Sequence, residues 1–225
     1  MTDYHNIDCM EGMKEFPDKY FELAIVDPPY GIGDFNISKS SSKLSKGYKI
    51  PSTEKYKPIN WNDNIPDKKY FDELYRVSKN TIIFGFQNYL EFINPKHTGI
   101  IIHDFVSGGF MSHGDVAITS LQKRVTMFKY RWCGFLRENK EPTDKNRIHP
   151  CEKPVSLYKW LLSNYAKQGD KILDTHVGSG SSIIAFEKHG FDYCGFEIDK
   201  DYYEASTKRI LKHRELLQQE KIAYD

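Results

Sequence analysis

The sequence predicts an α/β fold with a doubly wound, mostly parallel sheet, and four stretches carry this prediction. Residues 23–26 (LAIV) form a short apolar run that ends at Asp27 and is stopped by two prolines, as expected of a buried strand. Residues 170–190 have the pattern of a strand, a glycine-rich turn and a helix. Residues 191–199 indicate a second strand that ends in acids, and residues 201–221 a closing helix. Alternating strands and helices are typical of doubly wound sheets.

The remaining segments follow the same alternation. Apolar residues at helical spacing predict a helix within residues 63–80, and the run TIIFGF predicts a buried strand over residues 81–86. An amphipathic helix is predicted over residues 153–166, opened by a proline. Residues 97–148 contain short β-like runs separated by turns.

Length and composition predict one domain, residues 1–225, with an ordinary core. Hydrophobic residues make up 39% and charged residues 28% of the chain, and the net charge of +1 argues neither for nor against nucleic acid. The four cysteines are far apart and form no C-x-x-C pair, so we expect no metal site and reduced thiols. The polar N-terminus and the absence of a long apolar run predict a soluble, cytoplasmic protein with no membrane segment.

The segment after Asp174 is predicted to form a nucleotide-binding turn. This residue closes a strand, Gly178 and Gly180 lie in the turn before the helix, and Glu197 ends the next strand. An acid at that offset holds ribose hydroxyls in nucleotide-binding sheets. A third glycine for a dinucleotide is missing, since Ile183 occupies its place, so an adenosyl ligand without phosphates fits better than NAD or ATP. The alternative is a plain strand–turn–helix whose glycines serve packing.

The motif DPPY also follows a predicted strand. In open α/β sheets, ligands bind outside the carboxyl ends of the strands, where Asp27 and Asp174 are both expected. If the two strands are neighbours, the DPPY loop faces the adenosyl ligand. The alternative is a rigid loop in which Asp27 only caps a turn.

Three motifs together resemble a known family. DPPYGIG, then HPCEKP, then DTHVGSGSS with the trailing GFEID are similar to the motifs of DNA amino-methyltransferases. The order, with the catalytic motif before the cofactor motifs, resembles the β-group of adenine-N6 and cytosine-N4 enzymes, and in style the small phage or prophage-type adenine methylases. The resemblance covers residues 4–33, 58–90 and 145–212. It implies a Rossmann-like fold dependent on S-adenosyl-L-methionine.

The resemblance also implies cofactor contacts, residue by residue. Asp174, Gly178 and Gly180 would line the methionine and ribose side, and Glu197 would take the ribose hydroxyls. Asp8 would contact the adenine, although Ile7 stands where the family has glycine. The HPCEKP motif would place two residues near the methionine carboxylate, His149 and Lys153. Cys151, Glu152, Thr175 and His176 replace the usual family residues.

The family's chemistry explains the DPPY motif. An exocyclic amine on a base is a poor nucleophile, because its lone pair is delocalised into the ring. Asp27 would accept one N–H and the Pro28 carbonyl the other, so that the lone pair points at the methyl donor. Pro28 and Pro29 fix the backbone and offer no competing N–H. Tyr30 would stack on the flipped-out base. No metal and no covalent intermediate are needed.

Basic residues indicate two regions for DNA contact. The loop over residues 34–58 is serine- and lysine-rich, and we expect it to be mobile and to meet phosphates; a solvated loop is the alternative. The family keeps a target-recognition segment where residues 97–148 lie. The DNA-binding candidates are Lys39, Lys43, Lys46, Lys49, Arg124 and Arg131.

The expected partner is double-stranded DNA, and a homodimer and a cognate restriction endonuclease are further expectations from restriction-modification systems. The nearest alternative is the same chemistry on cytosine N4, for which the family more often carries SPPY. RNA or protein glutamine as substrate, a non-catalytic DNA-binding module and an NAD oxidoreductase are more distant alternatives. Binding of S-adenosyl-L-methionine separates the enzyme from the module.

Overall fold

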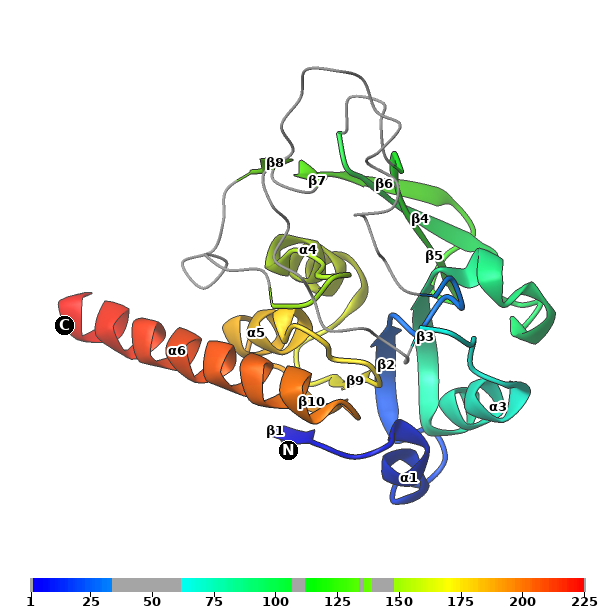
Figure 1. The fold of residues 1–225 in the computed structure, drawn as a ribbon, viewed down its shortest axis with the longest axis horizontal. Coiled ribbons are helices and arrows are strands. Elements are labelled where there is room, and N and C mark those ends of the chain that lie inside the picture. The colour runs from blue at the N-terminus through cyan, green and yellow to red at the C-terminus, as the bar shows by residue number, and fades with distance from the viewer. Residues whose placement is uncertain (1, 34–61, 107–111, 134–135, 139–147, 225) are drawn as a thin grey trace.

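The computed structural model describes residues 2–33, 62–106, 112–133, 136–138 and 148–224. Within these residues, eight strands form one sheet, in which only β5 runs antiparallel to its neighbours (Figure 1). The order across the sheet is β1 (Thr2–His5), β10 (Asp192–Phe196), β9 (Lys171–Asp174), β2 (Phe21–Val26), β3 (Ser78–Phe84), β5 (Gly114–Thr119), β4 (Gly99–Asp104) and β6 (Val125–Lys129). The mostly parallel α/β fold predicted from the sequence is confirmed.

The centre of the sheet settles a question that the sequence left open. Strands β2 and β9 are parallel neighbours, with Leu23 opposite Ile172 and Ala24 opposite Leu173. Asp27 and Asp174 therefore lie at the same, carboxyl edge of the sheet. The strand order reverses direction between β9 and β2, and such a switch point is where doubly wound sheets bind ligands.

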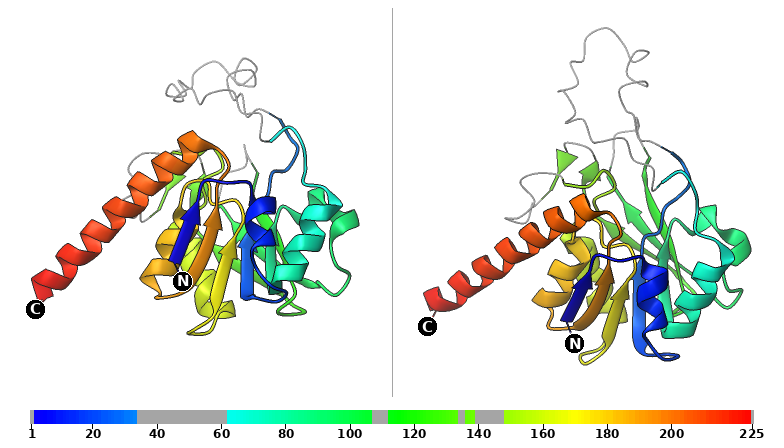
Figure 2. Two further views of the ribbon diagram at one scale, coloured as in Figure 1. Left: turned by 90° about the horizontal axis from the view of Figure 1, so that it is seen from below. Right: turned by 60° about the horizontal axis from the view of Figure 1, so that its bottom comes forward.

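Helices cover both faces of the sheet (Figures 1 and 2). One face carries α4 (Val155–Tyr165), α5 (Ser181–Lys188) and the start of α6 (Lys200–Tyr224), whose far end extends away from the body. The other face carries α1 (Cys9–Lys14) and α3 (Lys68–Val77). Two apolar clusters correspond to these two faces.

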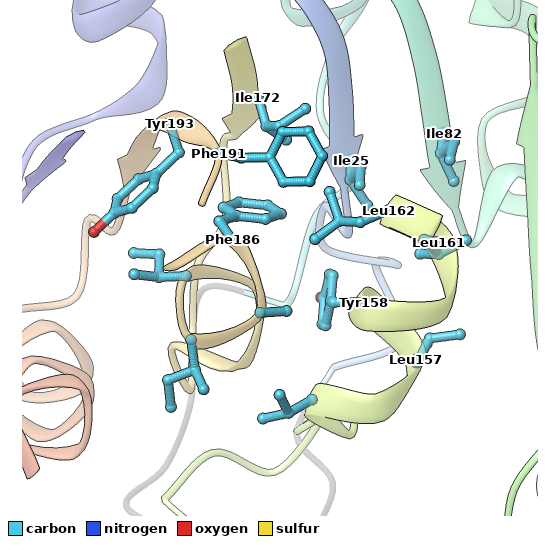
Figure 3. Packing of buried hydrophobic residues seen from close by; sticks show 14 of the residues in the cluster. Ile25, Ile82, Leu157, Tyr158, Leu161, Leu162, Ile172, Phe186, Phe191 and Tyr193 are labelled. Atoms are coloured by element: carbon cyan, nitrogen blue, oxygen red, sulfur yellow. The ribbon is translucent and has the colours of Figure 1, made fainter. Parts of the chain in front are cut away.

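Alternation along the central strands divides the two cores. Ile25 of β2 and Ile82 of β3 face α4, where Leu161 and Leu162 meet them (Figure 3). The neighbouring residue Val26 packs in the opposite cluster with α1 and α3. Because both faces of these strands are buried, their sequences are continuous apolar runs.

The element boundaries follow from local chemistry. Asp67 caps α3 by accepting a hydrogen bond from the Tyr70 N–H at 3.2 Å. Pro154 precedes α4, as predicted. Strand β3 begins earlier than predicted, at Ser78, and Phe86 belongs to the 3-10 turn η2 (Phe86–Asn88) instead of the strand. A second 3-10 turn, η3 (Leu90–Phe92), follows.

The segment 97–148 contributes mainly to the sheet. Strands β4, β5 and β6 lie within it, and the target-recognition role expected of the segment stays a prediction. There, β7 (Trp132–Cys133) and β8 (Leu136–Arg137) form a small ribbon. The basic loop of residues 34–58 lies outside the described residues. Among the helices that are described, none is long and apolar enough to cross a bilayer.

Candidate active site

A cavity of about 300 Å³ opens at the carboxyl edge of the sheet. It is lined by the loop Asp27–Tyr30 and by residues from the segments 149–158, 176–179 and 197–202. The two loops that the sequence predicted to meet therefore share one cavity, which has the size of small-ligand sites in proteins.

The Asp27 carboxylate is held by two side chains. The Tyr30 hydroxyl donates to Oδ1 at 2.7 Å, and Nζ of Lys153 lies 2.9 Å from Oδ2. The same ammonium lies 3.0 Å from Oδ2 of Asp115 at the start of β5. Only 6% of the Lys153 side chain is exposed. One buried cation is thus shared by two carboxylates.

Burial and charge act in opposite directions on this triad. Burial raises the pKa of Asp27, and the neighbouring Lys153 ammonium counteracts part of that rise. Burial alone would lower the pKa of Lys153, but Asp115 and Asp27 together raise it well above its usual value. Lys153 therefore remains a cation at neutral pH.

The backbone of the DPPY loop is clamped from behind. The buried Tyr89 hydroxyl donates to the Pro28 carbonyl at 2.7 Å and lies 3.1 Å from the Pro29 carbonyl. The Tyr30 N–H donates to Asn62 Oδ1 at 2.9 Å. A carbonyl oxygen has two lone pairs, so Pro28 keeps one for a further donor.

The Tyr30 ring depends on a glycine for its place. Gly85 follows β3 with φ of +66°, and a Cβ there would overlap the Tyr30 ring. Tyr89 contacts the same ring edge-on, with centroids 6.4 Å apart. Tyr30 is therefore fixed against the end of β3 as well as bonded to Asp27. The predicted stacking of a base on this ring stays a prediction.

The cofactor side is built on backbone contacts. Glu197 Oε2 accepts the Gly178 N–H at 2.8 Å and Oε1 accepts the Asp199 N–H at 2.9 Å. Burial raises the pKa of Glu197, and these two bonds offset part of that rise. The carboxylate keeps further lone pairs at the cavity wall, which fits a ligand with vicinal hydroxyls such as an adenosyl ribose.

Three predicted cofactor residues lie outside the cavity lining. Asp174 is 1% exposed and accepts the His176 N–H at 3.0 Å, and burial raises its pKa to about 7. Gly180, with φ of +78°, is the N-cap residue directly before α5. Asp8 caps α1 by accepting the Met10 N–H at 2.8 Å. Of the predicted set, Gly178, Glu197, His149 and Lys153 line the cavity.

His176 lines the cavity as well, in the place where the family has phenylalanine. The Tyr70 hydroxyl lies 2.7 Å from Thr175 Oγ1, which lies 2.9 Å from His176 Nδ1. Burial lowers the pKa of His176 to about 4, so this ring is neutral at pH 7. The two family departures, Thr175 and His176, thus form one hydrogen-bonded unit with Tyr70.

The HPCEKP motif is tied to the ribbon β7–β8. Arg137 and Glu152 form an ion pair at 3.2 Å, with 7% and 0% of their side chains exposed. The Trp132 indole N–H donates to the Glu152 carbonyl at 2.6 Å. Arg137, basic and in the segment assigned to target recognition, therefore fixes the motif that carries Lys153.

The DNA-binding candidates are separated in space. Arg131 is exposed and follows β6, which runs parallel to β4 and ends at the carboxyl edge. Arg124 precedes β6 and lies at the opposite edge, bonded to Gln122 at 3.1 Å, so it is removed from an interface around the cavity. Lys39, Lys43, Lys46 and Lys49 lie outside the described residues.

The sequence did not reveal Asp115, Tyr89, Asn62 or Tyr158 as site residues. Asp115 is brought to the edge by an antiparallel strand, and Tyr89 by a turn after β3, so no local motif marks either one. In the described part of the chain, no group of three metal-ligating side chains occurs.

Comparison with known proteins is consistent with this geometry. A family model described as DNA methylase matches residues 112–208. The type II methyltransferase M2.DpnII of Streptococcus pneumoniae is 31% identical over 213 residues, covering 92% of this chain and 71% of the relative. M.HpaI of Haemophilus parainfluenzae is 22% identical over 232 residues, covering 90% and 72%.

Solved structures share the fold. The M1.HpyAVI–SAM complex has a TM-score of 0.58 at 17% identity and covers 93% of this chain and 100% of that one. TTHA0409 of Thermus thermophilus, complexed with S-adenosyl-L-methionine, has 0.57 at 14%, covering 95% and 96%. The cytosine-N4-specific PvuII methyltransferase has 0.59 at 11%, covering 97% and 93%. The cofactor predicted from the sequence, S-adenosyl-L-methionine, is thus the ligand of two proteins with this fold. The chain belongs to the N6/N4 family of DNA amino-methyltransferases.

Proposed function

We propose that this chain methylates the exocyclic N6 of an adenine flipped out of double-stranded DNA, with S-adenosyl-L-methionine as the donor. The observation that carries the proposal is the shared cavity, with a carboxylate and a proline carbonyl in one wall and Glu197 with Gly178 in another. When bound, the cofactor supplies an electrophilic methyl group on a sulfonium.

The chain's own residues act on the amine of the base. Asp27 accepts one N–H of the amine and the Pro28 carbonyl accepts the other, so both protons are held and the lone pair is directed away from the ring. Lys153 and Tyr30 fix the carboxylate, and Tyr89 fixes the carbonyl, before the base arrives. Preorganised acceptors of this kind stabilise the positive charge that develops on the nitrogen.

Cytosine N4 is the second candidate substrate. Its amine has the same geometry of two N–H groups, and a structural neighbour is a cytosine-N4-specific enzyme. Asp27 in the first position of the motif favours adenine, because SPPY is more usual in cytosine enzymes. A homodimer and a cognate endonuclease remain predictions from the family resemblance.

The test is to express the protein in a methylation-deficient bacterium, digest its DNA to nucleosides and measure methylated bases by mass spectrometry. N6-methyladenine is expected from the wild type. Asp27→Ala is expected to lose about 100-fold or more, because it removes a preorganised acceptor. The matched control is Asp72→Ala, an exposed carboxylate paired with Lys68 on α3, which is expected to retain activity.

If N4-methylcytosine is found in place of N6-methyladenine, the proposed role of Asp27 and Pro28 as acceptors is kept, and the target base is cytosine instead of adenine. If the protein is folded and binds S-adenosyl-L-methionine but neither methylated base is found, DNA as the substrate is contradicted. Equal activity of Asp27→Ala and Asp72→Ala would contradict the role of Asp27.

A further inference from the structure

Asp115, which is not among the residues that line the cavity, brings an additional carboxylate to the buried Lys153 ammonium beside Asp27. It occupies the second position of β5, opposite His103 of β4. Because β5 runs antiparallel to β3, the start of β5 lies at the edge where β2 and β3 end. Asp115 therefore reaches the Asp27 site from a strand that lies outside the three motifs DPPYGIG, HPCEKP and DTHVGSGSS.

The charges around Lys153 do not balance. Its ammonium lies 2.9 Å from Asp27 and 3.0 Å from Asp115, and it also lies over the Phe84 ring, 4.7 Å from the centroid. Two carboxylates thus face one cation. Without Asp115, the Lys153 charge would be neutralised by Asp27 alone, and the group that receives the amine would be a neutral pair.

Among the described residues, the titratable groups that act on Asp27 and Lys153 beside Asp115 are the phenols Tyr30 and Tyr158, which carry no positive charge. Tyr158 is a buried and Tyr30 a half-buried phenol, and desolvation raises the pKa of each well above its usual value. His103 is neutral at pH 7, because burial lowers its pKa to about 4. Asp174 is a further acid, and burial is the main cause of its raised pKa of about 7. The triad with its two carboxylates ionised has a net charge of −1.

We propose that Asp115 is a positioning residue that engages Lys153 and leaves the catalytic end of the cavity with a net negative charge, through which the site favours a sulfonium donor over its neutral thioether product. This inference rests on the proposed function only in taking S-adenosyl-L-methionine as the ligand. The donor and product differ by one positive charge, so a unit charge that contacts the lining residue Lys153 changes their affinities unequally. Such charges interact strongly in a partly desolvated site.

The test is a pair of calorimetric titrations, with S-adenosyl-L-methionine and with S-adenosyl-L-homocysteine, on each of four proteins. In Asp115→Asn, the preference for the sulfonium over the thioether is expected to fall roughly tenfold relative to the wild type. Asp115→Glu keeps the charge and is expected to keep the preference. The matched control is Glu22→Gln, which removes a carboxylate bonded to Lys79 at the opposite edge, and is expected to behave as wild type.

A merely structural Asp115 would weaken both ligands equally, and an unchanged ratio in Asp115→Asn would overturn the inference. If Asp115→Asn does not fold, a lost preference in the folded Asp115→Glu variant would overturn it too. A wild type that binds neither ligand would overturn it together with the proposed function. The expected ratios in a protein that methylates no DNA would leave the inference standing and contradict the proposed function alone.

Discussion

The two loops that meet in the cavity are held in opposite ways. In the predicted cofactor turn, residues 174–180 with Glu197, the carboxylates of Glu197 and Asp174 accept three backbone N–H groups, two of which lie two residues further along the chain than their acceptor. In the predicted catalytic loop, residues 27–30, Asp27 and Pro28 contact side chains from distant elements: Lys153 and Tyr89. Backbone donors remain when a side chain changes, whereas a side-chain partner can be removed by one substitution. We therefore expect single substitutions of contacting side chains to destabilise the predicted catalytic loop more than the predicted cofactor turn.

The largest expected effect is on the shared cation. Lys153→Met leaves Asp27 and Asp115 facing each other with no counter-charge, and loss of one partner of a buried ion pair costs about 3–5 kcal/mol. Glu197→Gln, in the cofactor turn, is expected to cost only about 1 kcal/mol, because an oxygen acceptor remains. Urea unfolding followed by circular dichroism measures both.

The double variant Lys153→Met with Asp115→Asn is the control for this prediction. It removes one of the two uncompensated carboxylates, and is expected to recover part of the lost free energy of unfolding. Equal losses for Lys153→Met and Glu197→Gln would show that the two loops do not differ in this respect.

The same contrast explains what could be predicted from the sequence. The predicted cofactor turn was recognisable because Asp174, Gly178 and Glu197 lie within one strand–turn–helix–strand unit, whose spacing is a local property. Asp27 was recognisable from its motif, but its partners Asp115 and Tyr89 were not, because the antiparallel β5 and the turn after β3 bring them in.

For the fold as well, features with a local sequence pattern were predicted and features without one were not. The buried parallel strands were predicted because burial on both faces gives continuous apolar runs. Strand β1, a short edge strand of sequence TDYH, and the six-residue helix α1 were not predicted, because neither has such a run. Arg124 was assigned to DNA contact because it is basic and lies where the family keeps its target-recognition segment, and only the direction of β6 shows that it lies at the far edge.

The next prediction, of intermediate expected effect on stability, compares one glycine from each loop region. Gly85 beside the catalytic loop and Gly178 in the cofactor turn have similar positive φ, +66° and +54°. Alanine at Gly178 meets only the His149 ring, at 3.5 Å, and is expected to cost about 1 kcal/mol of backbone strain. Alanine at Gly85 also overlaps the Tyr30 ring, which adds about 1–3 kcal/mol.

Thermal unfolding of Gly85→Ala and Gly178→Ala measures this difference, and each variant is the control for the other. Displacement of Tyr30 also predicts that Gly85→Ala lowers the rate of methyl transfer while binding of S-adenosyl-L-methionine is retained. A Gly178→Ala protein less stable than Gly85→Ala would contradict the packing shown by the structure.

The smallest expected effect on stability is that of His103, the residue of β4 that pairs with Asp115 of β5. Both ring nitrogens are buried without a hydrogen-bond partner in the described residues, and the ring packs edge-on against Phe105 at 4.8 Å. His103→Phe keeps the ring shape and removes two unsatisfied polar atoms, so a gain of about 1 kcal/mol in unfolding free energy is expected at pH 7.

The pH dependence of the difference in unfolding free energy between wild type and His103→Phe is a second, independent test of this prediction. Burial lowers the pKa of His103 from 6.5 to about 4, so between these values the unfolded chain binds more protons than the folded one. The wild type should therefore lose stability relative to His103→Phe as the pH falls from 6.5 to 4. His176, whose pKa is also about 4, and Asp174 are present in both proteins, so their contributions cancel in the difference. Urea titrations at pH 7, 5.5 and 4.5 measure the difference. A constant value across this range would mean that His103 gains a proton without cost, and hence that the interior beside Asp115 is open to water.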